Sequence, residues 1–166
     1  MRPIGVTEVL RQIVGKAIMS VVGRDIQRAV GLQQLCAGQE AGCEAAVHTM
    51  HTIFADEETE GVLLVDASNA FNSLNRAVAL RNIRQICPSI ATVLINTYRA
   101  DAELFIEGTT IYSQEGTTQG DPLAMAFYAL ATVPLSKACK IEQLAGEVWF
   151  ADDATGGGRI DDLRRW

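Results

Sequence analysis

The stretch VWFADDATGGG, residues 148–158, places two adjacent aspartates between a short apolar run and three glycines. The apolar run has the composition of a buried strand, and the residues after the aspartates are predicted to return as its hairpin partner. Asp152 and Asp153 then belong to the turn of this hairpin, where their like charges repel each other. The turn is therefore either a solvated loop or a place where a divalent cation binds.

A second short apolar run, GVLLVDA at residues 61–67, predicts another buried strand, which ends at Asp66. The residues after it, 71–86, return to helical spacing and predict a helix with its arginines facing outward. The apolar residues expected to face inward on this helix are Phe71, Leu74, Val78, Ile83 and Ile86.

The rest of the chain alternates helical and strand patterns. Residues 6–23 have helical spacing with Thr7 as the expected N-cap, and a second helix is predicted at about 40–56. Further elements are a helix that starts at Pro88, two strands around a turn at Gly108, and an apolar helix with Pro122 in its first turn.

The order of elements after residue 60 predicts the fold. Strand, helices, two strands, helix, strand, turn and strand fit an α+β plan of the split βαβ type, with an antiparallel sheet and helices on one face. In this plan the end of the strand at Asp66 lies beside the turn at Asp152 and Asp153. Three carboxylates would converge there, which suits a pair of divalent cations.

The composition is that of one globular domain: 166 residues, of which 48% are hydrophobic and 20% charged. The net charge of −6 argues weakly against a nucleic-acid partner, but residues 1–35 carry a net +3 and residues 71–100 a net +4. No apolar run approaches the roughly 18 residues that span a bilayer. With no secretory signal visible, we expect an intracellular protein, nuclear or cytoplasmic, without a membrane partner.

The four cysteines show no CxxC spacing and are expected to be reduced thiols. A zinc site formed by Cys36, Cys43, His48 and His51 is an alternative, but its spacing matches no common zinc pattern. Two partly exposed histidines on a helix are the favoured interpretation.

Three segments in order carry a resemblance to a known family. VDASNAFNSL (65–74), EGTTQGDPLAM (115–125) and FADD (150–153) resemble the three palm motifs of reverse transcriptases, and look closest to those of non-LTR retrotransposons and group II introns. Residues 2–18, RPIGVTEVLRQIVGKAI, resemble the fingers segment that precedes the palm. The resemblance implies a polymerase palm over residues 60–166 and a partial, mainly helical fingers segment over residues 1–59.

The activity that this resemblance implies is RNA-directed DNA polymerisation, in which a primer 3′-hydroxyl attacks the α-phosphate of a dNTP. The partners would be an RNA template, a DNA or RNA primer and dNTPs. Such enzymes use two Mg²⁺ ions, or Mn²⁺ in their place, to offset the charge that develops in phosphoryl transfer. By the resemblance, Asp66 and Asp152 are the principal metal ligands and catalytic residues, and Asp153 supports them.

The resemblance also implies a set of nucleotide-binding residues. Arg2 matches an arginine that pairs with the triphosphate, and Asn69 and Ala70 match positions whose backbone N–H groups meet it. Gln119 matches a glutamine that contacts the nucleotide. Phe71 matches an aromatic residue that packs under the sugar and excludes a 2′-hydroxyl, although an ordinary core aromatic remains an equal alternative.

Two glycines of the second motif, Gly116 and Gly120, match positions where the backbone approaches the template and the nascent pair. The chain departs from the family at Asn72, where many relatives carry aspartate, and at Phe150, where tyrosine is more frequent. The family's primer-gripping hairpin and thumb would lie outside residues 1–166. We therefore expect low or no processive synthesis from this chain alone.

Two other interpretations stay open. The chain could be a catalytically inactive reverse-transcriptase-like remnant that acts as a binding or structural module. It could also be another palm enzyme, such as an RNA-dependent RNA polymerase or a nucleotide cyclase. Phe71 speaks against RNA synthesis, because a site that accepts a 2′-hydroxyl generally has a small residue at this position.

Overall fold

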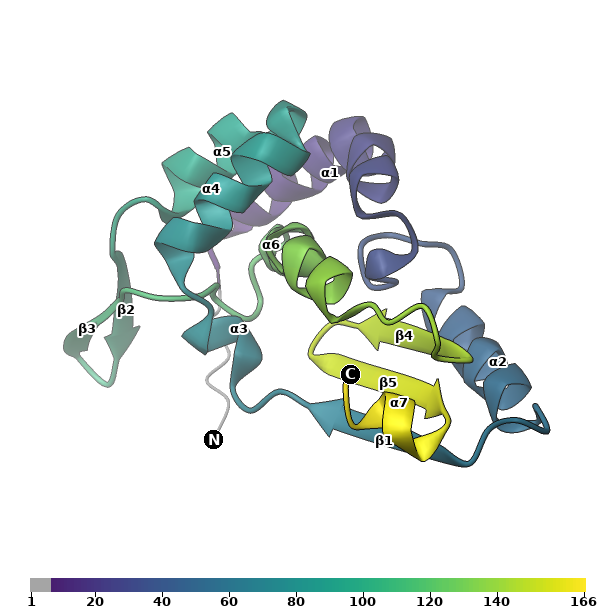
Figure 1. Ribbon diagram of the computed structural model, residues 1–166. Coiled ribbons are helices and arrows are strands. Elements are labelled where there is room, and N and C mark those ends of the chain that lie inside the picture. The colour runs from purple at the N-terminus through teal and green to yellow at the C-terminus, as the bar shows by residue number, and fades with distance from the viewer. Residues whose placement is uncertain (1–6) are drawn as a thin grey trace.

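A computed structural model describes residues 7–166 of the chain (Figure 1). Its helices are α1 (Val9–Val30), the short 3₁₀ helix η1 (Gly31–Gln33), α2 (Gly42–Phe54), α3 (Ala70–Ser73), α4 (Arg76–Ile86), α5 (Pro88–Tyr98), α6 (Ala124–Cys139) and α7 (Ile160–Leu163). Its strands are β1 (Gly61–Asp66), β2 (Ala102–Ile106), β3 (Thr109–Ser113), β4 (Gly146–Phe150) and β5 (Asp153–Gly158).

The larger sheet is antiparallel, with the strand order β1-β5-β4. Successive residues of a strand point to opposite faces, and two glycines of β5 show what covers each face. Gly157 faces Ile53 of α2, whereas Gly156 faces the indole ring of Trp166, which follows α7. Helix α2 and the α7 segment therefore pack on opposite faces of this sheet (Figure 1).

The main core lies among α1, α4, α5 and α6, and Figure 1 shows α6 between the other three helices and the sheet. Helix α6 is apolar on nearly all sides, as is expected of a helix that is buried rather than amphipathic. The large side chains that are fully buried in this core include Ile26, Ile83, Ile90, Leu94, Phe127, Leu130 and Val133.

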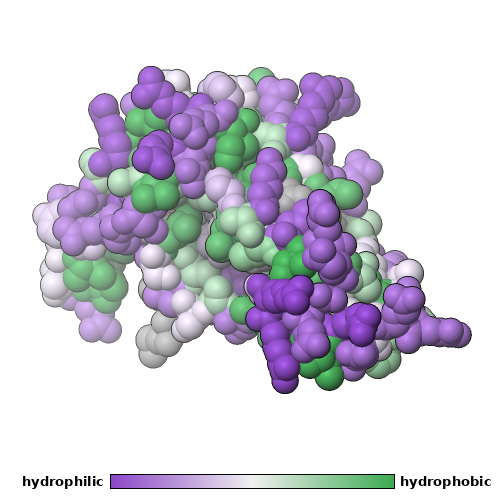
Figure 2. All heavy atoms as spheres, in the orientation of Figure 1, coloured by the Kyte–Doolittle hydropathy of each residue, from purple (hydrophilic) through white to green (hydrophobic). Residues whose placement is uncertain are grey.

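Strands β2 and β3 form the predicted hairpin, which extends away from the helices (Figure 1). Both residues of its tight turn have positive φ angles, 48° at Glu107 and 79° at Gly108, as primed hairpin turns require. The hairpin carries exposed hydrophobic side chains, which gather at its end of the molecule in Figure 2. These side chains are Phe105, Ile106, Ile111 and Tyr112.

The predicted α+β class with an antiparallel sheet is confirmed. Two predictions, one of a strand and one of a helix, were wrong in detail. Strand β1 is an edge strand, and Leu64 is 74% exposed rather than buried. The helix predicted over 71–86 is broken into α3 and α4 at Leu74 and Asn75, because the Asn75 side chain accepts a hydrogen bond of 2.9 Å from Val78 N and caps a new helix. Val78 is consequently exposed, and Arg76 is buried instead of facing outward.

Helix α1 also differs from its prediction. It begins at Val9, with Glu8 rather than Thr7 at the N-cap, and continues to Val30. The Thr7 hydroxyl instead donates a hydrogen bond to Gly120 O. Many of the apolar residues whose spacing predicted the helix are exposed, because only a narrow stripe of α1 before Ile26 contacts the core. The exposed residues are Val9, Leu10, Ile13, Val14 and Val21.

No helix within residues 7–166 is long and apolar enough to cross a membrane. His48 and His51 are exposed on α2, as predicted. Across the same residues, the zinc alternative finds no support, since no three His, Cys, Asp or Glu side chains form a group suited to a metal ion.

Candidate active site

The sheet brings the first and third sequence motifs together. Asp66, the last residue of β1, is the direct partner of Asp153, the first residue of β5. The pairing continues past the strand end, because Ala67 N donates a 3.1 Å hydrogen bond to Asp152 O. Directly opposed residues in an antiparallel pair have Cβ atoms about 4.5–5.5 Å apart, so this register holds two carboxylates side by side with a third one residue away.

Asp152 lies in a two-residue loop between Phe150 and Asp153, which are paired across β4 and β5. The first loop residue, Ala151, has a φ of 54°, a value that glycine adopts far more readily than alanine. A non-glycine residue keeps this conformation only when its surroundings hold it there. The turn that carries the carboxylates is therefore held by contacts outside the hairpin.

Phe71 lies beneath this turn. Its ring is 8% exposed and stacks on Tyr128 of α6, with centroids 4.3 Å apart and planes at 23°. Both rings belong to a small buried cluster that also contains Ala151. Burial, and then the negative charge of Asp152, raises the pKa of Tyr128 to about 12, so its hydroxyl is protonated at neutral pH.

The segment between Asp66 and Phe71 turns sharply at Asn69, which has a φ of 52°. The Asn69 side-chain oxygen accepts a 3.0 Å hydrogen bond from Asn72 Nδ2. The backbone carbonyl oxygen of Asn69 accepts a hydrogen bond from the Ser73 hydroxyl. Helix α3, which starts at Ala70, has only four residues. So short a helix contributes little macrodipole, which weakens the expected anion site at Asn69 and Ala70.

The second motif packs against α3 through its backbone. Gly116 N donates to Leu74 O at 2.8 Å, and Thr117 N donates to Phe71 O at 2.7 Å. Gly116 has a φ of 62°, and a Cβ atom there would overlap Phe71 O. A contact within the protein is therefore enough to explain why this position is glycine.

Arg76 holds the same loop from the side of α4. Its guanidinium donates to Gly116 O at 3.0 Å, to Ser113 O at 2.9 Å and to Glu115 O at 3.0 Å. Its backbone N–H donates to the Glu115 carboxylate at 2.7 Å. The side chain also lies over the Tyr98 ring, and burial lowers the pKa of Arg76 from its usual value.

Helix α1 holds the far end of this loop. Arg11 Nε donates to Asp121 Oδ2 at 2.7 Å, and Asp121 Oδ1 accepts from Leu123 N at 2.8 Å. Gln12 Nε2 donates to Gly120 O at 3.1 Å. Gln119 is half-buried between the parts of the loop fixed by Arg76 and by α1, and Gly120 is exposed with a φ of 102°.

The predicted site residues thus fall into two connected groups. Asp66 is paired with Asp153 at the end of the sheet, with Asp152 in the adjoining turn, and Phe71 links this end of the sheet to the loop that contains Gln119. Arg2 lies outside the described residues. Sequence reasoning missed Arg76, which it placed on the solvent side of a helix, and Gln34, which contacts the Ala151 turn.

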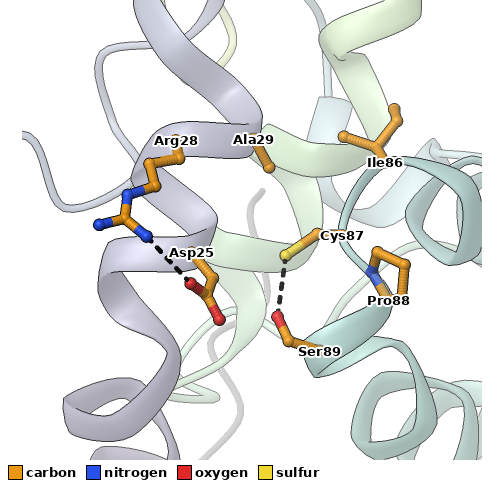
Figure 3. A pocket seen from close by; sticks show the side chains of 7 residues that line it. All are labelled: Asp25, Arg28, Ala29, Ile86, Cys87, Pro88 and Ser89. Atoms are coloured by element: carbon orange, nitrogen blue, oxygen red, sulfur yellow. Dashed lines mark hydrogen bonds and ion pairs between the residues drawn. The ribbon is translucent and has the colours of Figure 1, made fainter.

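A separate hollow of about 360 Å³ lies where α1 meets the junction of α4 and α5 (Figure 3). Figure 3 shows Arg28 turned toward Asp25, and Cys87 turned toward Ser89. The Arg28–Asp25 pair is 3.8 Å apart and the Cys87 Sγ to Ser89 Oγ distance is 3.4 Å. The hollow contains none of the three carboxylates, and the polar side chains that line it pair with each other.

No protein-family model and no curated protein sequence matches this chain. Among solved structures, the chain is similar to apo telomerase from Candida tropicalis truncated from its C-terminal domain, with a TM-score of 0.61 and 13% sequence identity. The match covers 90% of this chain and 35% of the telomerase chain, so the chain spans about a third of the length of that structure. The similarity shows a distant reverse-transcriptase-like fold, consistent with a polymerase palm.

Proposed function

We propose that the chain is the core of an RNA-directed DNA polymerase of a retroelement, of the non-LTR or group II intron kind. It would transfer a nucleotide from a dNTP to a primer 3′-hydroxyl on an RNA template. The observation that carries the proposal is the register that sets Asp66 opposite Asp153, with Asp152 in the adjoining turn. The fold similarity to a telomerase supports it.

The three carboxylates suit magnesium. Mg²⁺ is a hard cation that takes oxygen ligands, usually one or two protein carboxylates together with waters and substrate phosphates. Asp66 and Asp152 would hold the two ions, with support from Asp153, and Mn²⁺ would substitute. The ions would offset the negative charge that develops on the transferred phosphoryl group. Because substrate phosphates complete such a shell, the lack of a ready-made three-ligand group in residues 7–166 is compatible with this role.

The residues around the carboxylates would bind the nucleotide. Phe71 supports the floor of the site through its stack on Tyr128 and would exclude a 2′-hydroxyl from the sugar pocket. Gln119 would contact the nucleotide from a loop that Arg76 and α1 hold at both ends. Asn69, Ala70 and Gly120 would line the path of the triphosphate and the nascent pair.

The test is incorporation of a single dNTP into a primer annealed to an RNA template, because one turnover does not require processive synthesis. Wild-type protein with Mg²⁺ or Mn²⁺ should extend the primer by one nucleotide. Asp66→Asn and Asp152→Asn should each abolish extension, whereas Asp161→Asn, an exposed aspartate of α7, should not change it. Equal extension by the wild-type and Asp152→Asn proteins would overturn the proposal.

A gel-shift assay, run beside the extension assay, separates the polymerase from a non-catalytic module. A module would bind the annealed template and primer, yet would add no nucleotide with either cation. It would also bind with the same affinity after the Asp152→Asn substitution, because that carboxylate would have no ion to hold.

A further inference from the structure

The turn that carries Asp152 is held by a residue far away in the sequence. Gln34 Nε2 donates a 2.8 Å hydrogen bond to Ala151 O, and Gln34 Oε1 accepts a 2.9 Å hydrogen bond from Ala151 N. The two residues are 117 positions apart, and Gln34 is 0% exposed. One side-chain amide therefore satisfies both polar groups of a single buried residue.

Ala151 needs such a partner for two reasons. Its φ of 54° is unfavourable for a residue with a Cβ by roughly 1 kcal/mol or more. Its N–H and C=O are also shielded from water, because Ala151 is buried, and an unpaired buried backbone group costs about 1–3 kcal/mol. The paired amide of Gln34 offsets both costs only when the turn has the conformation seen here.

The segment around Gln34 is itself fixed against the sheet. Leu35 N donates to Trp149 O at 2.9 Å, which places this segment alongside β4. The Cys36 thiol donates to Gln34 Oε1 at 3.1 Å and so helps to orient the amide. Gln34 is thus positioned before any ligand arrives, and its contact point is the residue directly before Asp152.

We propose that Gln34 is a positioning residue of the carboxylate turn, which fixes Ala151 in its left-handed conformation and thereby aims Asp152 toward Asp66. The inference rests on the proposed function, since it assigns the turn a role in metal binding and nucleotide transfer. Gln34 itself touches neither the metal ions nor the substrate.

Gln34→Met tests this role, because methionine has a similar volume and removes both hydrogen bonds. We expect the kcat of single-nucleotide incorporation to fall by about 10- to 100-fold, as misplaced catalytic groups typically cause, with little change in the KM for dNTP. The Kd for Mn²⁺, measured by electron paramagnetic resonance, should rise in parallel. Gln34→Leu, a second apolar residue of similar size, removes the same two hydrogen bonds and serves if the methionine variant does not fold.

A second substitution separates positioning from general stability. Glycine adopts a positive φ without a penalty, so Ala151→Gly in the Gln34→Met background should restore part of the lost kcat and Mn²⁺ affinity. Because glycine also removes strain from the folded state, kcat and Mn²⁺ affinity are compared well below the midpoint of thermal unfolding of each variant, where a difference in stability alone changes neither. Gln39→Met is the matched control: Gln39 Nε2 donates to Gly31 O at 3.3 Å and does not touch the turn, so kcat should not change.

The outcomes distinguish the two proposals. Active wild-type protein together with a folded Gln34→Met variant of unchanged kcat and Mn²⁺ affinity would overturn the role of Gln34 and leave the polymerase assignment intact. A kcat loss in Gln34→Met that Ala151→Gly does not relieve would also overturn it. A wild-type protein that neither binds Mn²⁺ nor extends a primer would overturn the proposed function, and this inference with it.

Discussion

Arg76 Nε donates a 3.0 Å hydrogen bond to Gly116 O, which ties the first turn of α4 to a loop 40 residues further along the chain. Arg76 is 6% exposed, and its other donors are used by backbone and side-chain oxygens of the same region. A buried cation in this position joins the segment after the first motif to the second motif.

Arg76→Ala should therefore be strongly destabilising. It leaves the buried carbonyl oxygen of Gly116 and the part-buried hydrogen bonds to Ser113 O and Glu115 O without their donor. We expect a loss of about 2–3 kcal/mol in the free energy of unfolding, measured by urea denaturation. Arg81→Ala, at an exposed position of the same helix, should cost less than about 0.5 kcal/mol. Equal losses for the two variants would contradict the role assigned to Arg76.

Gly116→Ala should also destabilise the protein, through the packing of the loop on α3. An added Cβ would overlap Phe71 O, so the loop must move away, at an expected cost of more than about 2 kcal/mol. Gly108→Ala is the control, since Gly108 has a φ of 79° but no atom within 4 Å of an added Cβ. That substitution should cost about 1 kcal/mol in the same urea measurement. If the two losses are the same, the contact with Phe71 is not what requires glycine at Gly116.

Magnesium should stabilise the folded protein if the carboxylates bind it. A ligand that binds only the folded state at about ten times its Kd adds roughly 1.4 kcal/mol. For a chain of this size that energy corresponds to a rise of about 3–6 °C in the midpoint of thermal unfolding over its value in EDTA. Asp66→Asn should remove the rise and Asp161→Asn should retain it. A rise that persists in Asp66→Asn would mean that the ion binds elsewhere.

The Cys36 thiol should make stability depend on pH in the alkaline range. Burial raises the pKa of Cys36 from 9.0 to about 11, with a smaller contribution from the charge of Asp152. Above pH 9 the unfolded thiol ionises while the folded thiol keeps its proton, so stability falls until the pH passes the folded pKa. Between about pH 8 and about pH 10 the loss due to Cys36 should be roughly 1 kcal/mol.

The measurement is urea denaturation at both pH values in EDTA and a reducing agent, for wild type and Cys36→Ser. Serine keeps a hydroxyl donor for Gln34 but does not titrate in this range, so the variant should lose less stability. Parallel pH profiles for the two proteins would show that Cys36 does not contribute.

The fold and the pairing of Asp66 with Asp153 were predictable because both depend on local patterns. Short apolar runs that end at Asp66 and at Asp152 predict strands, and the split βαβ order then brings their ends together. The hairpin around Gly108 was predictable in the same way, from a turn signal between two strand patterns. None of these steps needs knowledge of a contact between particular side chains.

Arg76 and Gln34 could not be found in this way. Helical spacing places an arginine on the solvent side, and only the later approach of residues 113–116 converts that side into a buried one. Gln34 follows a short 3₁₀ helix with no periodic pattern, and its partner is 117 residues away. The burial of Arg76 and the role of Gln34 both depend on contacts between residues far apart in the sequence, and no regular spacing of residues in one sequence indicates such contacts.

The exposure of β1 has the same origin. An apolar strand pattern indicates burial, but it does not tell a central strand from an edge strand. Within residues 7–166, β1 pairs only with β5, and Leu63, Leu64 and Val65 are exposed. The pattern predicted the strand correctly and its surroundings wrongly.

The exposed edge strand β1 has a practical consequence for handling the protein. Its unpaired backbone donors and acceptors, beside apolar side chains, favour the addition of a strand from another molecule, so concentrated preparations should tend to aggregate through this edge. A lysine in place of Leu63, which is 41% exposed and lies on the face of β1 opposite Asp66, would add a charge at this edge away from the carboxylates. Purification for the assays above would benefit from that single change.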